Sequence, residues 1–156
     1  MTLNKLKTLK KERGFTIVEL LIVIVVIGIL AAIVIVAYNG VQNRAKTTSA
    51  QSSAVTMQKK LEAYNASQGA YPAAASATTS LNSVTEAALT GTGLSIGTPT
   101  ATTGTTTIKV EICTAPAAAT GYKVYYWDYT TGALPGTPQI TGGTNSTACT
   151  TYTAAT

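Results

Sequence analysis

The fold of this chain is decided by residues 14–33, which read GFTIVELLIVIVVIGILAAI. No charged residue occurs in residues 20–43, and residues 20–37 are apolar throughout. Because a helix rises about 1.5 Å per residue, residues 15–38 make a helix of roughly 35 Å, enough to cross a hydrocarbon core of about 30 Å. A helix in a soluble core is rarely apolar on every face over this length. We therefore predict a membrane-inserted helix over residues 15–38.

One carboxylate, that of Glu19, stands near the start of this apolar run. An ionised carboxylate carried to the middle of a bilayer would cost about 2.5 kcal/mol or more. Two interpretations follow. In the first, Glu19 lies at headgroup depth and stays hydrated. In the second, it pairs with a cation inside a water-free bundle of helices, where an α-amine would supply the charge.

The residues around Glu19 resemble the type IV prepilin family: a short basic leader, Gly14, Phe15, three further residues, Glu19 and a long aliphatic helix. The resemblance covers residues 5–38. It implies that a prepilin peptidase cuts after Gly14 and that the new amino terminus on Phe15 is N-methylated. It also implies that Glu19 assists processing and pairs with the Phe15 amine of a neighbouring subunit during assembly.

The sequence departs from this family at Val36, where many pilins have a proline that distorts the helix. Without that proline, Gly28 is the only obvious weak point of the apolar segment, at about 1 kcal/mol relative to alanine. The sequence therefore leaves open how far the helix melts when subunits pack into a filament.

The formal charge of +5 is concentrated in the leader, residues 1–14, which holds five basic residues against one acid. The remaining chain has six basic and five acidic residues, a net charge of only +1. The basic character is therefore a targeting signal, and direct binding of nucleic acid is not expected. The five basic residues before the span, against Arg44 and Lys46 just after it, place the amino end in the cytoplasm and the rest of the chain outside.

An ordinary secretory signal peptide is the competing interpretation of the amino-terminal segment. Its apolar region would be about 7–15 residues long and would end at a small-x-small cleavage site. Here the apolar run is longer, and no Ala-x-Ala pattern follows it closely.

The two cysteines, Cys113 and Cys149, agree with an outside location and have 35 residues between them. In an oxidising compartment they would close a loop worth about 3–4 kcal/mol. The alternative is two free, buried thiols. Neither cysteine has the spacing of a redox or metal-binding motif.

The helix is expected to continue beyond the membrane over residues 39–68 as an amphipathic segment. One face carries apolar side chains at spacings of four, three, four and three, at Ala50, Ala54, Met57, Leu61 and Tyr64. We interpret this stripe as packing on a sheet. The helix is expected to end at residues 69–72, Gly-Ala-Tyr-Pro, because glycine and proline are typical of carboxy-terminal stops.

Residues 69–104 are predicted to connect the helix to a sheet. Within them, residues 83–89 are expected to form a short helix, with Ser83 and Glu86 at capping-box spacing. Residues 105–113 and 122–129 have the alternating or aromatic, β-branched pattern of strands. A hairpin-like loop over residues 115–121 joins them, residues 130–145 are expected to be loop, and a third strand is possible near residues 148–153. The expected fold of residues 105–156 is a small antiparallel sheet with a disulfide loop, and the chain as a whole is α+β with the pilin fold.

Catalytic chemistry is missing from this sequence, which has no histidine and a single aspartate. Ser-His-Asp and Cys-His catalysis are excluded, and no plausible zinc site remains. We predict that the chain is not an enzyme and has no cofactor or metal. The aromatic residues within 122–129 suggest a stacking platform for single-stranded DNA or sugars, which is weighed against ordinary strand core.

The leading hypothesis is a structural subunit of a type IV pilus-like surface filament, supporting adhesion, twitching motility or DNA uptake, as the resemblance implies. Its partners would be prepilin peptidase, membrane lipid before assembly, the assembly machinery of the cytoplasmic membrane, and further copies of itself in the extracellular filament. The first alternative is a pseudopilin of a secretion or competence system. The others are an anchored adhesion domain that never polymerises and a nucleic-acid receptor.

Overall fold

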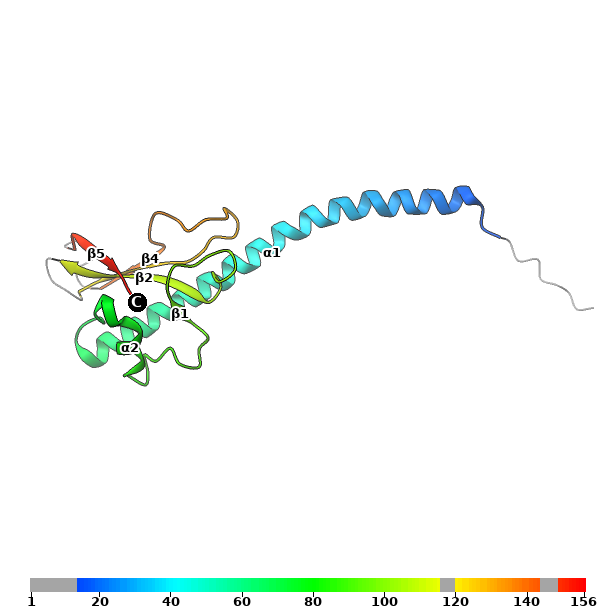
Figure 1. Ribbon diagram of the computed structural model, residues 1–156. Helices are drawn as coiled ribbons and strands as arrows, with labels where there is room; N and C mark the ends of the chain where they lie inside the picture. Colours follow the sequence, from blue (N-terminus) through cyan, green and yellow to red (C-terminus); the bar gives the residue numbers. More distant parts are fainter. Residues whose placement is uncertain (1–13, 116–119, 144–148) are drawn as a thin grey trace, which may run out of the picture. The chain divides into compact units, whose positions relative to one another are not determined.

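The computed structural model describes residues 14–115, 120–143 and 149–156 (Figure 1). The chain divides into two compact units, residues 1–39 and 40–156, which we describe separately. The helical elements are α1 (Ile17–Gln68), a 3₁₀ turn η1 (Ala74–Ser76) and α2 (Ala77–Asn82). The described strands are β1 (Ser95–Ile96), β2 (Thr107–Ala115), β3 (Tyr122–Tyr125), β4 (Ile140–Gly142) and β5 (Thr151–Ala154). A long helix followed by a small sheet confirms the predicted α+β class.

In the first unit, α1 passes through Gly28 and Val36 without interruption. Its large apolar side chains in residues 15–38 are between 47 and 85 % exposed within this single chain. Exposed apolar surface costs about 25 cal/mol per Å² in water, so this segment needs apolar surroundings that the chain itself does not supply. Among the described residues, α1 is the one helix long and apolar enough to cross a membrane.

In the second unit, α1 turns one face toward the core. Ala50, Ala54, Met57 and Leu61 are fully buried, and Tyr64 packs against the same cluster, as the periodicity predicts. The helix ends at Gln68, and Gly69 adopts a φ of +74°. Glycine takes this left-handed conformation without steric cost, which explains the stop at the predicted position.

The short helix after α1 lies earlier than residues 83–89, so that prediction is wrong. The chain forms α2 instead, and residues 83–87 are turns. Burial decides the position, because Ala77 and Leu81 lie one helical turn apart and are both fully buried. The side-chain oxygen of Asn82 then accepts a hydrogen bond from the backbone N–H of Leu89 at 2.8 Å and closes the segment into a loop.

The sheet follows the order β1-β2-β3-β4, and β5 also pairs with β2. The pairs β2·β3, β2·β5 and β3·β4 are antiparallel, as predicted. The pair β1·β2 is parallel, which makes the sheet mixed and differs from a purely antiparallel one. The segment between the two strands explains this difference. Residues Gly97 to Thr106 return the chain to the end of the sheet at which β1 begins, so β2 runs in the same direction as β1.

Two strand boundaries differ from the sequence prediction. β3 ends at Tyr125, four residues early, because the side-chain amide of Gln139 pairs with both the N–H and the C=O of Tyr126 in place of a strand. β4 lies inside the predicted loop 130–145, where neighbouring glycines and prolines hide its signal. β5 occupies the place of the possible third strand. Residues 116–119 of the predicted hairpin loop lie outside the described residues.

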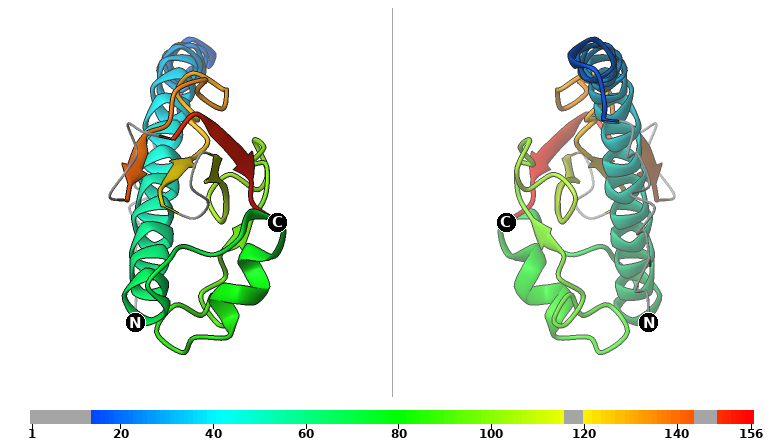
Figure 2. Two further views of the ribbon diagram at one scale, coloured as in Figure 1. Left: turned by 90° about the vertical axis from the view of Figure 1, so that its left-hand side faces the viewer. Right: turned by 90° about the vertical axis from the view of Figure 1, so that its right-hand side faces the viewer.

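The core of the second unit lies between α1 and one face of the sheet. Ile108, Val110 and Ile112 alternate along β2 and are at most 1 % exposed, and they join Met57 and Leu61 in one cluster. Figure 2 shows α2 beside the last residue of the chain. There the backbone N–H of Thr78 donates to the carbonyl of Thr156 at 3.1 Å, so the residues after β5 hold α2 in place.

Candidate functional site at the start of the long helix

Gly14 and Phe15, the predicted cleavage pair, directly precede α1. Phe15 is 84 % exposed, and Gly14 is exposed as well. A Cβ added at Gly14 would meet nothing within 4 Å. The described part of the fold therefore does not require glycine at position 14.

Glu19, the predicted assembly residue, lies in the first turn of the helix and forms a capping box with Thr16. Its Oε2 accepts hydrogen bonds from the backbone N–H of Thr16 at 2.8 Å and from the Thr16 hydroxyl at 2.7 Å. In return, the Thr16 hydroxyl accepts the backbone N–H of Glu19 at 3.2 Å. This reciprocal pattern satisfies donors that every helix leaves without partners at its amino end.

Through the capping box, the Glu19 carboxylate has hydrogen-bond partners within its own apolar segment. Both hydrogen bonds to the side chain reach Oε2, and within the described residues Oε1 makes no hydrogen bond. A buried carboxylate with hydrogen bonds costs less than a bare one, and one oxygen is left for a cation. The carboxylate is therefore held by Thr16 through one oxygen and keeps the other without a partner among the described residues.

Sequence reasoning did not single out Thr16. The signal was present, because Thr16 and Glu19 have the S/T-x-x-E spacing of a capping box directly before an apolar run. The same pattern was noticed at Ser83 and Glu86, where the structure forms no helix. The difference is that an uninterrupted helical segment follows Thr16, whereas turns follow Ser83.

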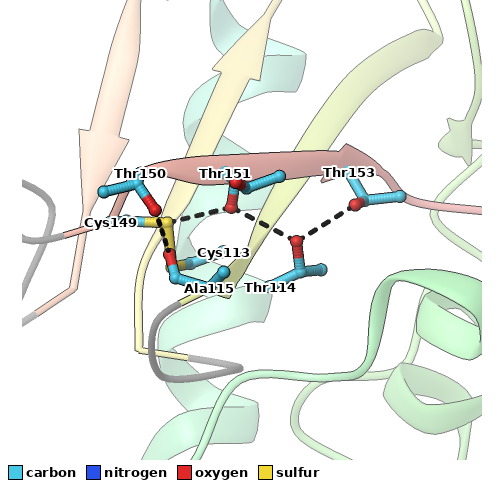
Figure 3. Close-up of a disulfide and its surroundings, with 7 residues drawn as sticks. All are labelled: Cys113, Thr114, Ala115, Cys149, Thr150, Thr151 and Thr153. Atoms are coloured by element: carbon cyan, nitrogen blue, oxygen red, sulfur yellow. Dashed lines mark hydrogen bonds between the residues drawn. A yellow bond between two sulfur atoms is a disulfide. The ribbon is translucent and has the colours of Figure 1, made fainter.

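Cys113 and Cys149, the other predicted pair, form a disulfide in the sheet of the second unit, with their Cα atoms 5.9 Å apart (Figure 3). Cys113 is 1 % exposed in β2, next to an irregularity in its pairing with β5. Beside the disulfide, the Thr114 hydroxyl donates to the carbonyl of Thr151 at 3.3 Å. The cross-link therefore reinforces the β2·β5 pair.

The aromatic residues of 122–129 do not form one stacking platform. Tyr122 is fully buried on the core side, where its hydroxyl donates to Glu62 at 2.7 Å. Tyr125 lies on the other face, where the Lys109 ammonium covers its ring at 4.8 Å and its hydroxyl donates to Glu111 at 2.9 Å. We therefore interpret these aromatics as sheet packing, which was the plainer of the two sequence interpretations.

Glu62 receives two tyrosine hydroxyls, because Tyr71 also donates to it at 3.0 Å and meets the ring of Tyr122 edge to face. Burial, followed by the hydrogen bond to Glu62, raises the pKa of Tyr71 to about 12. The same causes raise the pKa of Tyr122 well above its ordinary value. This cluster fastens the last turns of α1 to the sheet.

A second set of hydrogen bonds joins α1 to the rest of the second unit at Thr47. Its hydroxyl donates to Asp128 at 3.2 Å and accepts the backbone N–H of Tyr129 at 3.0 Å. The backbone N–H of Thr130 also donates to Asp128 at 2.8 Å, and this bond is the main cause that lowers the pKa of the carboxyl. In the described part of the chain, no group of three His, Cys, Asp or Glu residues could hold a metal ion.

Among known families, the Prokaryotic N-terminal methylation motif matches residues 9–35 of the chain. The chain therefore carries a prepilin-type amino-terminal motif, as the residues from Gly14 to Glu19 predict. The match covers the segment in which the structure places the capping box of Thr16 and Glu19.

Curated relatives share part of this chain. The "Type II secretion system core protein G" of Escherichia coli (strain K12) is 37 % identical over 62 residues, 40 % of this chain and 43 % of the relative. The protein of that name from Dickeya chrysanthemi is 33 % identical over 63 residues, 40 % of this chain and 41 % of the relative. The one from Vibrio cholerae is 31 % identical over 67 residues, 43 % of this chain and 46 % of the relative.

The aligned part of this chain thus spans less than half the length of the curated relatives it matches. No solved structure matches the chain. Neither the matched motif nor the relatives are those of an enzyme, in agreement with the sequence prediction that this protein is not one.

Proposed function

We propose that this protein is a membrane-anchored structural subunit that assembles through its apolar helix into a pilin-like filament. The observation that carries the proposal is the arrangement at the start of α1, where an exposed Gly14–Phe15 bond precedes a carboxylate held by Thr16. The matched methylation motif supports the same role. A simple membrane anchor would require neither a cleavable glycine nor a carboxylate inside the apolar run.

In this proposal, prepilin peptidase cuts between Gly14 and Phe15 and removes the basic leader. The cut creates a free α-amine on Phe15, which is then methylated. Cleavage leaves the capping box intact, because the N–H and hydroxyl of Thr16 both lie on the carboxyl side of the cut. The Phe15 amine of one subunit then pairs with the Glu19 carboxylate of the next and fixes the axial register.

Assembly exchanges one apolar environment for another. The exposed side chains of residues 15–38 contact lipid before assembly and the helices of other subunits afterwards. Because both surroundings are apolar, the exchange has little hydrophobic cost, and packing together with the Glu19–amine pair determines its direction. The second unit stays outside the membrane throughout.

Within this class, a pseudopilin of a secretion system is better supported than a surface pilus subunit. The relatives described above carry the name of a core protein of type II secretion systems. We therefore place the subunit in a short filament associated with the cytoplasmic membrane. Adhesion, twitching motility and DNA uptake belong to the surface-pilus hypothesis, which the amount of filament in sheared surface material separates from this one.

The proposal is tested by intact mass and amino-terminal sequencing of the protein recovered from membranes and from sheared surface material. We expect a chain that begins at Phe15, is heavier by one methyl group and is found mainly with the cell envelope. A species of that kind abundant in sheared filaments would instead favour the surface pilus. A chain that retains Met1 would contradict both and leave an anchored domain that does not polymerise.

Glu19→Ala and Glu19→Gln sharpen the test. Both variants remove the negative charge, but glutamine keeps a side-chain oxygen for the Thr16 donors. If the carboxylate pairs with an amine, both variants lose cross-linkable oligomers to a similar extent. Full assembly of Glu19→Gln would show that helix capping alone is the role of this residue.

A further inference from the structure

Two basic side chains, those of Arg44 and Lys46, lie near the start of the part of α1 that belongs to the second unit. Arg44 and Lys46 are both exposed, and within the described residues neither forms an ion pair. The Lys46 ammonium lies 5.6 Å from the centre of the Tyr129 ring. The backbone of Tyr129 is in turn bonded to Thr47, the next residue of α1, so the ring and the cation are held by the same helical turn.

Chain length places these cations close to the membrane surface. Arg44 follows Tyr38, the last residue of the predicted span, by six positions, and Lys46 follows it by eight. At about 1.5 Å per helical residue, these steps amount to roughly 9–12 Å, and the headgroup layer is about 5–8 Å deep on each side. Helical side chains lean toward the amino end of their helix, and long basic side chains extend to reach an interface.

Nearby negative charge does not neutralise this pair. The carboxylate of Asp128 accepts hydrogen bonds from Thr47, the neighbour of Lys46 in α1, and from the backbone of Thr130. This one acidic group beside two basic residues leaves a local excess of one positive charge. The Tyr129 ring lies beside the Lys46 ammonium, and tyrosine is enriched at membrane–water interfaces.

We propose that Arg44 and Lys46, with Tyr129, form a headgroup-binding patch that holds the second unit against anionic phospholipid before assembly. The occupant is the phosphate of an anionic lipid headgroup, because the patch continues along the chain from the membrane-spanning segment and carries the complementary charge. The patch rests on the proposed function, since only an unassembled, membrane-inserted subunit presents it to lipid. Extraction into a filament then requires the release of these headgroups.

The chain contains its own probe for this contact, because its single tryptophan is Trp127, two residues before Tyr129. The full-length protein is inserted into phosphatidylcholine nanodiscs with a trace of dansyl-labelled phosphatidylglycerol or dansyl-labelled phosphatidylcholine. Energy transfer from Trp127 reports the enrichment of each labelled lipid near the second unit. We expect labelled phosphatidylglycerol to be enriched about fivefold for each basic residue, and the enrichment to fall in high salt.

The decisive comparison is between two double variants with the same change in charge. Arg44→Gln with Lys46→Gln should reduce the preference for phosphatidylglycerol to the level that the leader alone produces. Lys59→Gln with Lys60→Gln, which lie 13 or more positions further along α1, should retain it. The leader is present in every variant, so its own attraction for anionic lipid is common to all. Circular dichroism checks that the variants fold.

Equal transfer to the two lipids in the wild type, or the same loss in both double variants, would overturn the patch. Failure of the patch is distinguishable from failure of the proposed function, since the first leaves cleavage at Gly14 and assembly unchanged. Conversely, a chain that is never cut but still enriches phosphatidylglycerol would contradict the filament subunit and keep the patch.

Discussion

The two units of this protein both contain large apolar side chains, but they differ in how far these side chains are exposed. In residues 14–39, the large apolar side chains are between 47 and 85 % exposed, and only the capping box supplies side-chain hydrogen bonds. In residues 40–156, comparable side chains such as Leu61 and Ile108 are fully buried. The second unit can therefore fold on its own contacts, whereas the first is completed only by lipid or by other subunits.

This contrast separates the effects of substitutions. A change in the first unit should alter processing and assembly while leaving the free energy of unfolding of the second unit untouched. A change in the second unit should do the reverse, provided enough folded protein remains. Each prediction below tests one side of this division.

The largest effect is expected from Gly14→Val. A branched side chain beside the scissile bond hinders the close approach of a peptidase to the backbone. The variant should retain its leader completely, as measured by intact mass, and should form no filament. Because a Cβ at this position meets nothing within 4 Å, the thermal unfolding of the second unit should match that of the wild type. A shift in that unfolding would contradict the separation of the two units.

Removal of the disulfide should have the next largest effect, confined to the second unit. Replacing Cys113 and Cys149 together with alanine opens a loop of 35 intervening residues, which corresponds to about 4 kcal/mol of unfolding free energy in the chain-entropy estimate. Urea unfolding monitored by Trp127 fluorescence measures the loss, and reduction of the wild type should reproduce it. A loss below about 1 kcal/mol would mean that the β2·β5 pairing does not depend on the cross-link.

Leu61→Ala should destabilise the second unit by about 3 kcal/mol, because it leaves a cavity between α1 and the sheet. Val55→Ala is the matched control on the same helix, since Val55 is 36 % exposed and should change stability by about 0.5 kcal/mol or less. Cleavage at Gly14 should stay normal in both variants. Similar losses in the two variants would show that helix propensity, rather than burial, governs this face.

The sequence predicted best where one physical effect dominates. The apolar segment of α1, the buried stripe that ends at Leu61 and the stop at Gly69 each follow from periodicity or backbone freedom alone. The cysteine pairing followed from there being only two cysteines. The Glu19 region was found through its resemblance to prepilins, and the role of Thr16 in the capping box was readable but missed.

The sequence predicted least where side chains replace backbone partners or where burial overrides local propensity. Nothing in the pattern shows that Gln139 ends β3 by pairing with Tyr126, nor that Thr47 fastens the turn at Asp128. The short helix predicted at residues 83–89 was misplaced for the second of these reasons, because the burial of Leu81 decides where the helix forms. Such contacts join residues far apart in the chain, so only the folded structure brings them together.

The smallest effect is expected from alkaline pH and touches the second unit alone. Tyr71 and Tyr125 each have a pKa raised to about 12, chiefly by burial and then by hydrogen bonds to Glu62 and Glu111. In the unfolded chain these groups titrate near pH 10, so their contribution to stability is complete below about pH 10 and is lost as the pH rises toward 12. Tyr71→Phe is the matched control, because it removes one of these two hydroxyls and keeps the ring. Urea unfolding at pH 9 and pH 11 should show a decrease that is smaller in Tyr71→Phe, because phenylalanine has no proton to lose. An equal decrease in the two proteins would show that the Tyr71 hydroxyl and its bond to Glu62 do not contribute to the alkaline loss.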